Sequence, residues 1–333
     1  MIAKSMPNLL LAGDVGGTKT LLGLFEPAAP RPRSLLTRSF GTLEHADLPT
    51  MIRMFMRDGA VKDGMVTSAC FGVAGPVIDQ AAALTNVVWH VDAREIARIF
   101  ALDRVRLLND LVAMAHALPV LEASELQVLQ QGTRDPGGNL ALIAAGTGLG
   151  EALVHNIEGQ LVPSPSEAGH GDFAARTERE IVLLRELTSR YGRADVEHVI
   201  SGRGLVNIHR AMHREPCAAS IDLDSADAPA LITTAAVNRS CPGCVETLDL
   251  FVEAYGAEAG NLALRSVATG GVFIGGGIAP KILPALAAGG FMQAFRAKSP
   301  LDAMVADIPV NVILNPEAGL LGAAAFAGAT RHS

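Results

Sequence analysis

One aspartate and one threonine lie in a cluster of glycines near the amino terminus, in the string Asp14-Val15-Gly16-Gly17-Thr18, and apolar runs flank the string on both sides. Glycine supplies the positive φ angles of tight turns and lets backbone N–H groups approach an anion closely. The neighbouring carboxylate suits a metal ion that prefers oxygen ligands. The apolar runs favour two buried strands. The string therefore predicts a hairpin whose turn holds a phosphate, and an ordinary glycine-rich hairpin is the alternative.

Two better-known phosphate loops do not fit this string. A P-loop places glycine directly before Lys-Thr and continues as a helix, whereas here Thr18 precedes Lys19 and the residues that follow are typical of a strand. A dinucleotide fingerprint, G-x-G-x-x-G, opens a helix, and neither condition is met.

The same pattern recurs twice further along the chain. Gly146-Thr147-Gly148 lies between two apolar runs, and Gly275-Gly276-Gly277 follows a short apolar run and precedes Pro280. Pro280 could open a helix, because proline is favoured at the first helical position. Two phosphate-type hairpins in one chain indicate two similar halves that face one nucleotide. Unrelated structural hairpins are the alternative.

The pair Asn109-Asp110 could supply acid–base chemistry. A short apolar strand over 105–108 is predicted directly before it, and α/β folds place ligands at the carboxyl ends of such strands. Phosphoryl transfer to an alcohol requires a group that accepts the hydroxyl proton as the O–P bond forms, and Asp110 is the candidate. Asp110 also precedes an apolar helical run, where aspartate is a favoured N-cap, and spacing alone favours the cap.

Together the three glycine clusters resemble the phosphate-1, phosphate-2 and adenosine motifs of the actin-like ATPase superfamily of sugar kinases. Further segments narrow the resemblance to the ATP-dependent, zinc-free bacterial glucokinases. These segments are Phe71–Pro76, Leu84–Trp89, Leu107–Asp110, Ser166–Phe173 and Glu197–Asn207. The resemblance runs in order from about Leu9 to about Phe326.

The resemblance implies a nucleotide site that binds ATP and Mg²⁺. Asp14 would hold the magnesium through water. The terminal phosphates would contact Gly16, Gly17 and Thr18 in the first half, and Thr147 and Gly148 in the second. The adenosine would be bordered by Gly275, Gly276 and Gly277.

The resemblance also implies a sugar site. Asp110 would be the general base and Asn109 would bind sugar hydroxyls, as would Glu167, His170 and Glu197. A carboxylate suits this role because its two oxygens can accept hydrogen bonds from adjacent hydroxyls. For Glu167 and His170 the alternative is a structural ion pair, and metal binding is a third interpretation. For Glu197 the alternative is a solvated helix residue. Asn86 and Trp89 match a segment near the sugar cleft, and Trp89 could equally be core.

The resemblance implies an α/β fold of the actin-like ATPase, ribonuclease H-like type, with two domains and a cleft between them. Residues 1–119 and 312–333 would form a small α/β domain, and residues 120–311 a large α/β domain. The alternation of strands and helices indicates an α/β fold independently. The predicted elements include a strand over 66–73 and helices over 93–100, 111–118, 202–213 and 248–267.

Composition excludes two classes of partner. The chain has 333 residues and a net charge of −7 with dispersed basic residues, so we expect no nucleic-acid partner. No uncharged apolar run reaches spanning length and the amino-terminal stretch is too short for a signal peptide, so we expect a cytoplasmic protein without a membrane partner.

Cys241 and Cys244 form a lone C-x-x-C, which favours reduced thiols without zinc.

We therefore expect phosphorylation of D-glucose by ATP to glucose 6-phosphate, the entry to glycolysis, with glucose and ATP as partners of a homodimer. A kinase for another hexose or amino sugar is one alternative. A sugar-responsive regulator without catalysis is another. Regulators of this superfamily carry a helix-turn-helix domain before the first phosphate motif, and with 13 residues before Asp14 we do not expect DNA binding. Three residues of this chain depart from the family pattern: Lys19 stands where Asn is frequent, Ala168 where Gly is usual and Arg203 where Pro is common. These departures bear on which sugar the site prefers.

Overall fold

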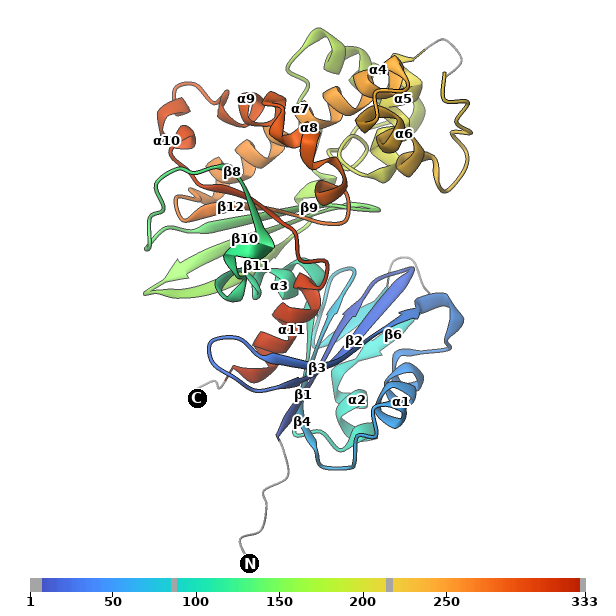
Figure 1. The fold of residues 1–333 in the computed structure, drawn as a ribbon, viewed down its shortest axis with the longest axis vertical. Coiled ribbons are helices and arrows are strands. Elements are labelled where there is room, and N and C mark those ends of the chain that lie inside the picture. The colour runs from blue at the N-terminus through green and yellow to red at the C-terminus, as the bar shows by residue number, and fades with distance from the viewer. Residues whose placement is uncertain (1–7, 85–88, 214–217, 330–333) are drawn as a thin grey trace, which may run out of the picture. The chain divides into compact units, whose positions relative to one another are not determined.

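The computed structural model describes residues 8–84, 89–213 and 218–329, and these residues form two compact units. The first unit comprises the chain up to Glu122 together with the segment that starts at Glu317. The second unit comprises Ala123–Pro316. Each unit contains one large sheet with helices packed against it (Figure 1).

The sheet of the first unit contains five strands in the order β3-β2-β1-β4-β7. The first three strands pair antiparallel, and β1, β4 and β7 run parallel. The strands are β1 (Leu9–Val15), β2 (Lys19–Glu26), β3 (Arg33–Gly41), β4 (Val66–Val73) and β7 (Arg104–Asn109). A short hairpin of β5 (Ala81–Ala83) and β6 (His90–Asp92) lies beside them.

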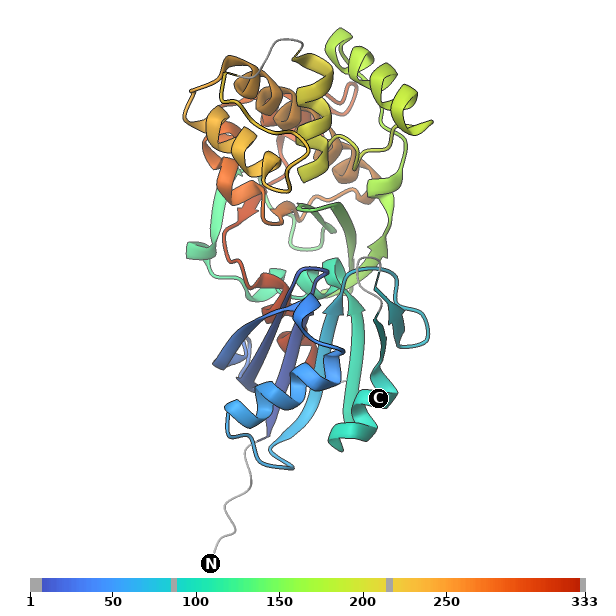
Figure 2. The same ribbon diagram turned by 90° about the vertical axis from the view of Figure 1, so that its right-hand side faces the viewer.

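Both faces of this sheet are buried, which explains the continuous apolar sequence of β1. Successive side chains of a strand point to opposite faces. Leu9 and Leu11 therefore join a core with α1 (Leu48–Asp58) and α2 (Ala93–Phe100), whereas Leu10 and Ala12 join a second core with α11 (Ala318–Gly328). Figure 2 shows α1 and α2 covering the same face. The short helix α3 (Asp110–Ala115) follows β7 directly.

The sheet of the second unit repeats the scheme of the first. Its order is β11-β10-β9-β12-β13-β8, again with three antiparallel strands followed by parallel β12 and β13. One further antiparallel strand, β8, closes the far edge. The strands are β8 (Leu126–Gln130), β9 (Leu140–Ala145), β10 (Leu149–Ile157), β11 (Gln160–Ser166), β12 (Gly271–Gly275) and β13 (Val310–Ile313). This repetition agrees with the two similar halves expected from the glycine turns.

Helices pack over the second sheet around the 25-residue helix α7 (Pro242–Ser266). Tyr255 on α7 is fully buried and makes edge-to-face contacts with Phe251 and Phe291. The other helices are α4 (Glu178–Tyr191), α5 (Gly202–Met212), α6 (Ala228–Val237), α8 (Leu283–Ala287), α9 (Gly290–Arg296) and α10 (Asp302–Ala306).

Most of the expected elements are present, and three helical expectations need correction. The helix after Asp110 ends at Ala115 instead of Leu118, because Pro119 lacks an N–H and its segment forms a separate 3₁₀ turn. Helix α7 begins at Pro242, six residues earlier than expected. Pro280 lies in a 3₁₀ turn before α8 and does not open an α-helix. Within residues 8–84, 89–213 and 218–329, no helix is long and apolar enough to cross a bilayer.

Candidate functional site

The first glycine turn is a tight hairpin in the first unit, as the sequence predicts. Val15 pairs with Thr20 across β1 and β2, and the Gly16 N–H donates to the Lys19 carbonyl oxygen at 3.1 Å. Thr42 holds this turn from the side. Its N–H donates to the Thr18 carbonyl oxygen at 2.9 Å, and its hydroxyl donates to the Gly16 carbonyl oxygen at 2.8 Å. The exposed Thr18 is therefore presented on a fixed backbone.

The reason for glycine in this turn differs from the expected one. Neither Gly16 nor Gly17 has a positive φ angle, so the expectation of left-handed backbone is wrong here. A Cβ atom on Gly16 would lie 3.0 Å from the Lys19 carbonyl oxygen, which is tighter than almost all real Cβ contacts. Glycine is needed at position 16 because the backbone segments approach each other closely, and not because the backbone is left-handed.

Asp14 provides a carboxylate that suits a cation. Desolvation by burial raises its pKa from 3.8 to about 6, against the opposing effect of the Lys19 charge. Gly319 of α11 backs onto it, since a Cβ there would lie 2.9 Å from Asp14 Oδ2. Nothing in the described part of the chain hydrogen-bonds to this carboxylate. A desolvated oxygen donor of this kind fits a hard ion such as Mg²⁺.

Asn109, not Asp110, is the N-cap of α3. Asn109 Oδ1 accepts hydrogen bonds from the backbone N–H groups of Leu111 at 3.0 Å and Val112 at 3.3 Å, and Nδ2 donates to the Gly75 carbonyl oxygen at 3.3 Å. Asp110 is the first helical residue and also accepts from the Leu111 N–H, at 2.9 Å. The capping alternative for Asp110 is therefore wrong, and its carboxylate is not required for the cap.

Asp14 and Asp110 lie at the same edge of the first sheet. Strands β1, β4 and β7 run parallel, so their carboxyl ends meet there, and Asp14 pairs with Gly72 while Val73 pairs with Asn109. Gly72 also pairs with Leu108, so Leu108 is level with Asp14 and two strand spacings, about 10 Å, from it, and Asp110 follows two residues later. Gly72 lies between Asp14 and Leu108, and a Cβ there would lie 2.8 Å from the Ala113 Cβ and 3.5 Å from the Asp110 Cα.

The second and third glycine turns lie side by side in the second unit. The Gly146 N–H donates to the Gly148 carbonyl oxygen at 2.8 Å, and Thr147 between them is exposed. Gly276 has a φ of +83°, and a Cβ there would lie 2.3 Å from the Ala145 carbonyl oxygen. Here glycine is needed for both handedness and space. Strands β9 and β12 run parallel, which brings both turns to one edge.

Tyr255 joins the two strands that carry these turns. Its buried hydroxyl accepts from the Ala145 N–H at 3.2 Å at the end of β9. Carbonyl oxygens of Ile143 on β9 and Gly275 on β12 lie 3.4 and 3.5 Å from the same oxygen. The desolvated hydroxyl has a pKa well above its ordinary value, so it stays protonated and can donate. Tyr255 thus fixes the spacing of the two turns.

Glu197 contacts the second glycine turn directly. Its Oε2 accepts from the Leu149 N–H at 2.9 Å, and its Oε1 accepts from Arg203 Nη2 at 3.2 Å. The Glu197 N–H donates to the Gly169 carbonyl oxygen at 2.8 Å. Gly169 is required there, because a Cβ would lie 2.3 Å from the Leu149 carbonyl oxygen. Glu197 therefore connects the end of the turn at 146–148 with the segment that contains Glu167 and His170.

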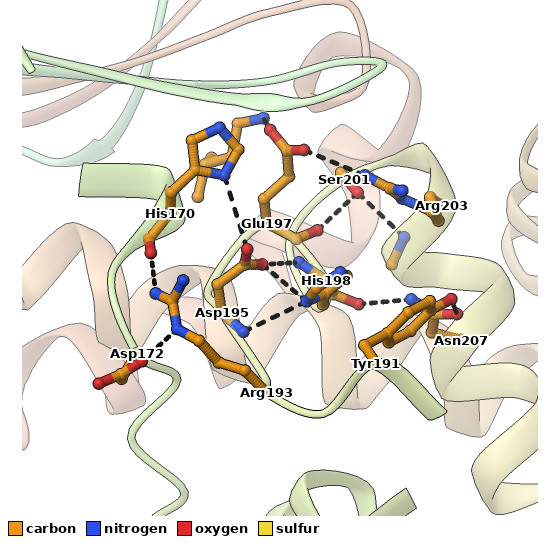
Figure 3. A network of polar contacts seen from close by, with 12 residues as sticks. His170, Asp172, Tyr191, Arg193, Asp195, Glu197, His198, Ser201, Arg203 and Asn207 are labelled. Atoms are coloured by element: carbon orange, nitrogen blue, oxygen red, sulfur yellow. Dashed lines mark hydrogen bonds and ion pairs between the residues drawn. The ribbon is translucent and has the colours of Figure 1, made fainter. Parts of the chain in front are cut away.

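His170 is paired with Asp195 rather than with Glu167. Its Nδ1 lies 3.5 Å from Asp195 Oδ2, and Oδ1 of the same carboxylate lies 2.9 Å from His198 Nδ1. The His198 ring stacks on Tyr191, with centroids 4.3 Å apart. Asp195 is buried between the two imidazoles, as Figure 3 shows. The alternative of a structural ion pair between Glu167 and His170 is therefore wrong.

Asp195 and Arg203 contact the candidate residues His170 and Glu197, and the sequence did not predict either of them as a site residue. Asp195 is two residues before Glu197, and Arg203 was noted only as a departure from the family pattern. Glu197 itself precedes α5, and its side chain is 15% exposed, so it is not a solvated helix residue. Trp89 is buried in the core of the first unit. Asn86 lies outside the described residues.

The cysteines carry no disulfide in the described part of the chain. Cys70, Cys241 and Cys244 are buried and form no disulfide, and Cys217 lies outside the described residues. The fold brings His213 against Gly243 of the C-x-x-C segment. Among the described residues, no group of three or more His, Cys, Asp or Glu side chains is arranged to hold a metal.

A family model and curated relatives show the family of this chain. The family model described as Glucokinase matches residues 11–330. The chain is 38% identical to a glucokinase of Synechocystis sp., over 95% of this chain and 97% of that protein. It is similar to the crystal structure of a glucokinase from an Antarctic psychrotroph, with 29% identity, a TM-score of 0.84 and coverage of 96% and 98%. A ROK family glucokinase from Streptomyces griseus, solved with glucose and AMPPNP, shares the fold, with a TM-score of 0.65, 20% identity and coverage of 96% and 99%.

Proposed function

The chain belongs to the glucokinase family and phosphorylates glucose with ATP on the actin-like ATPase fold, and from this premise we propose which of its residues carry the reaction. The observation that carries the assignment is the family match over nearly the whole chain. All the residues proposed below lie within the matched range.

Asp110 is the general base of the reaction. The glucose 6-hydroxyl is too weakly acidic to ionise by itself, so its proton passes to the Asp110 carboxylate as the oxygen attacks the γ-phosphorus. The O6–P bond forms, the bond from the γ-phosphorus to the β–γ bridging oxygen breaks, and ADP leaves with that electron pair. The capping role of Asn109 supports this assignment, because the N-cap of α3, which spacing alone assigned to Asp110, is provided by its neighbour.

Five side chains bind the glucose hydroxyls in this proposal. Asn109 and Asp110 come from the carboxyl end of β7, and Glu167, His170 and Glu197 come from the second unit. Asn109 Oδ1 is used by the cap, so its Nδ2 group is the part that donates to a sugar oxygen. Glu167 and His170 are both exposed to solvent, which leaves them accessible to a ligand.

The glycine turns bind the nucleotide. Gly16, Gly17 and Thr18 contact the terminal phosphates, Thr147 and Gly148 contact them from the second unit, and Gly275–Gly277 border the adenosine. Asp14 holds Mg²⁺, which neutralises phosphate charge when it is bound. The support for Asp14 is a desolvated carboxylate with a pKa of about 6 and no hydrogen-bond donor in the described chain.

Turnover of a hexose panel tests the substrate assignment. We expect glucose with ATP to give the highest kcat/KM among glucose, mannose, fructose, glucosamine and N-acetylglucosamine. ADP and polyphosphate in place of ATP test the phosphate donor. A higher kcat/KM for mannose or an N-acetylated sugar would contradict the assignment. The proposed homodimer is checked separately by sedimentation velocity.

A further inference from the structure

We propose that Arg203 is a positioning residue that holds the Glu197 carboxylate in its glucose-binding orientation. The inference rests on the proposed role of Glu197 as a sugar ligand. Arg203 departs from the family pattern, and it has no role in the reaction described above.

Two different donors fix the Glu197 carboxylate, one on each oxygen. The Leu149 N–H bonds Oε2 at 2.9 Å, and Arg203 Nη2 bonds Oε1 at 3.2 Å. Because the donors lie on opposite oxygens, they restrict the terminal torsion of Glu197, which is otherwise soft. Each carboxylate oxygen can accept a second hydrogen bond. The pair therefore fixes the carboxylate plane and leaves acceptor capacity for sugar hydroxyls.

The backbone of Arg203 is fixed relative to Glu197 as well. Ser201 caps α5, accepting from the Gly204 N–H at 3.0 Å, and its hydroxyl donates to the Glu197 carbonyl oxygen at 2.7 Å. The Gly202 N–H donates to the Gly146 carbonyl oxygen at 2.8 Å. Arg203 is the second residue of this helix. The guanidinium is thus supplied from a rigid helix start (Figure 3).

The two sides of the Glu197 carboxylate are bounded differently within the described residues. A Cβ on Gly148 would lie 2.5 Å from Glu197 Oε2, so the backbone of the turn blocks movement toward it. On the Oε1 side the partner is the Arg203 side chain, which is 56% exposed, whereas Glu197 is 15% exposed. Truncation of Arg203 opens that side to water without creating a core cavity. We therefore expect the variant to fold.

The experiment is a double-mutant cycle on glucose affinity. Glucose binding to Arg203→Ala, Glu197→Gln and the double variant is measured by calorimetric titration, alongside steady-state kinetics. We expect Arg203→Ala to raise the glucose Kd about three- to tenfold, with KM for glucose rising in parallel and kcat changing less than about twofold. In the Glu197→Gln background, Arg203→Ala should add no further loss, because the group it positions has gone. Arg203→Lys, which keeps the charge but lacks the planar fork, should restore the affinity only in part.

Arg179 offers a matched control. It is also the second residue of its helix, α4, and its Nη2 pairs with Glu246 Oε1 at 3.3 Å. Arg179→Ala removes the same charge from the same unit and should leave the glucose Kd within about twofold of wild type. Melting temperatures of all variants establish that each is folded.

The possible failures are distinguishable. Glucose affinity unchanged in Glu197→Gln would overturn the sugar role of Glu197, and the inference with it. If Glu197→Gln weakens glucose binding and Arg203→Ala does not, the positioning role of Arg203 is overturned while the sugar role of Glu197 stands. The same conclusion follows if the two losses of glucose affinity add in the double variant. An equal loss of affinity for a non-hydrolysable ATP analogue would also overturn it, since it would mean that Arg203 acts on the nucleotide.

Discussion

Asn109 caps the helix on which Asp110 is the first residue. Asn109 Oδ1 accepts from the N–H groups of Leu111 and Val112, and the Asp110 side chain accepts from Leu111 as well. The cap therefore belongs to Asn109, whereas the proposed base is Asp110. The proposed base can thus be removed without removing the cap.

Asp110→Asn should abolish most turnover while the protein stays folded. The amide keeps the shape and the hydrogen bond to Leu111 but cannot act as a base, so kcat should fall by ~10² to 10⁴. Glucose affinity by direct titration should change less than about tenfold. Because Asn109 provides the cap, the melting temperature should stay near that of wild type. Wild-type turnover in this variant would contradict a base role for Asp110.

Asn109→Ala should show the complementary pattern. Loss of an N-cap costs about 1 kcal/mol of stability, so the melting temperature should fall. Glucose affinity should weaken in the same variant if Nδ2 binds the sugar. A thermal melt and a titration on one preparation check both effects, and a stable variant with normal affinity would refute both roles of Asn109.

Gly319→Ala should raise the Mg²⁺ requirement. The new Cβ would lie 2.9 Å from Asp14 Oδ2 and would displace the proposed metal ligand. Changes in the shell behind a metal ligand typically cost 10- to 100-fold in metal affinity, so the Mg²⁺ midpoint of the rate should rise by about tenfold. Gly328→Ala, on the same helix α11 but beside Leu10, is the control and should leave the midpoint unchanged. The same midpoint in both variants would argue against Asp14 as the magnesium residue.

Tyr255→Phe should weaken nucleotide binding more than glucose binding. Removal of the hydroxyl leaves the buried Ala145 N–H without its partner, which costs about 1–3 kcal/mol of stability. The turns at the ends of β9 and β12 lose their common anchor, so KM for ATP should rise. Tyr191→Phe removes the bond from the other tyrosine to Asn207 and is the matched comparison, with KM for ATP expected within about twofold of wild type. Equal KM values for ATP in the two variants would contradict the anchoring role.

Glu151 should make folding stability depend on pH. It is fully buried on β10, and neither carboxylate oxygen hydrogen-bonds to the described chain. Desolvation, reinforced by Glu258 and opposed by Arg265, raises its pKa from 4.5 to about 8. The folded state therefore retains a proton that the unfolded state loses above pH 4.5. The stabilisation from that proton is complete below pH 4.5 and falls, by at most ~1.4 kcal/mol per pH unit, until about pH 8.

Glu151→Gln should remove this dependence. The amide has nearly the same shape and does not ionise, so the variant should gain stability relative to wild type as pH rises from 5 to 8. Denaturant unfolding at several pH values measures the difference. Glu246→Gln, a half-exposed carboxylate of the same unit, should leave the pH profile of wild type unchanged. A wild-type profile in Glu151→Gln would mean that this carboxyl is already ionised in the folded protein.

The sequence by itself determined the features whose causes are local. Each glycine turn with its flanking apolar runs could be read directly, because a hairpin joins segments that are adjacent in the chain. Strand β4 and helix α2 begin and end where their apolar patterns predict. Asn109, Asp110 and Glu197 could be proposed as site residues because they lie in short contiguous motifs that resemble those of the family.

Tertiary structure alone decided which distant groups meet. A cap depends on where the helix starts to within one residue, and packing of α3 against β4 and α11 places that start at Asp110 rather than one residue later. His170 could pair with any nearby carboxylate, and the chain reversal between 172 and 195 brings Asp195 to it instead of Glu167. Helix α11 joins the first unit because its apolar face buries the even-numbered side of β1. In each case the partner is chosen by contacts between segments far apart in sequence, and no local pattern encodes those contacts.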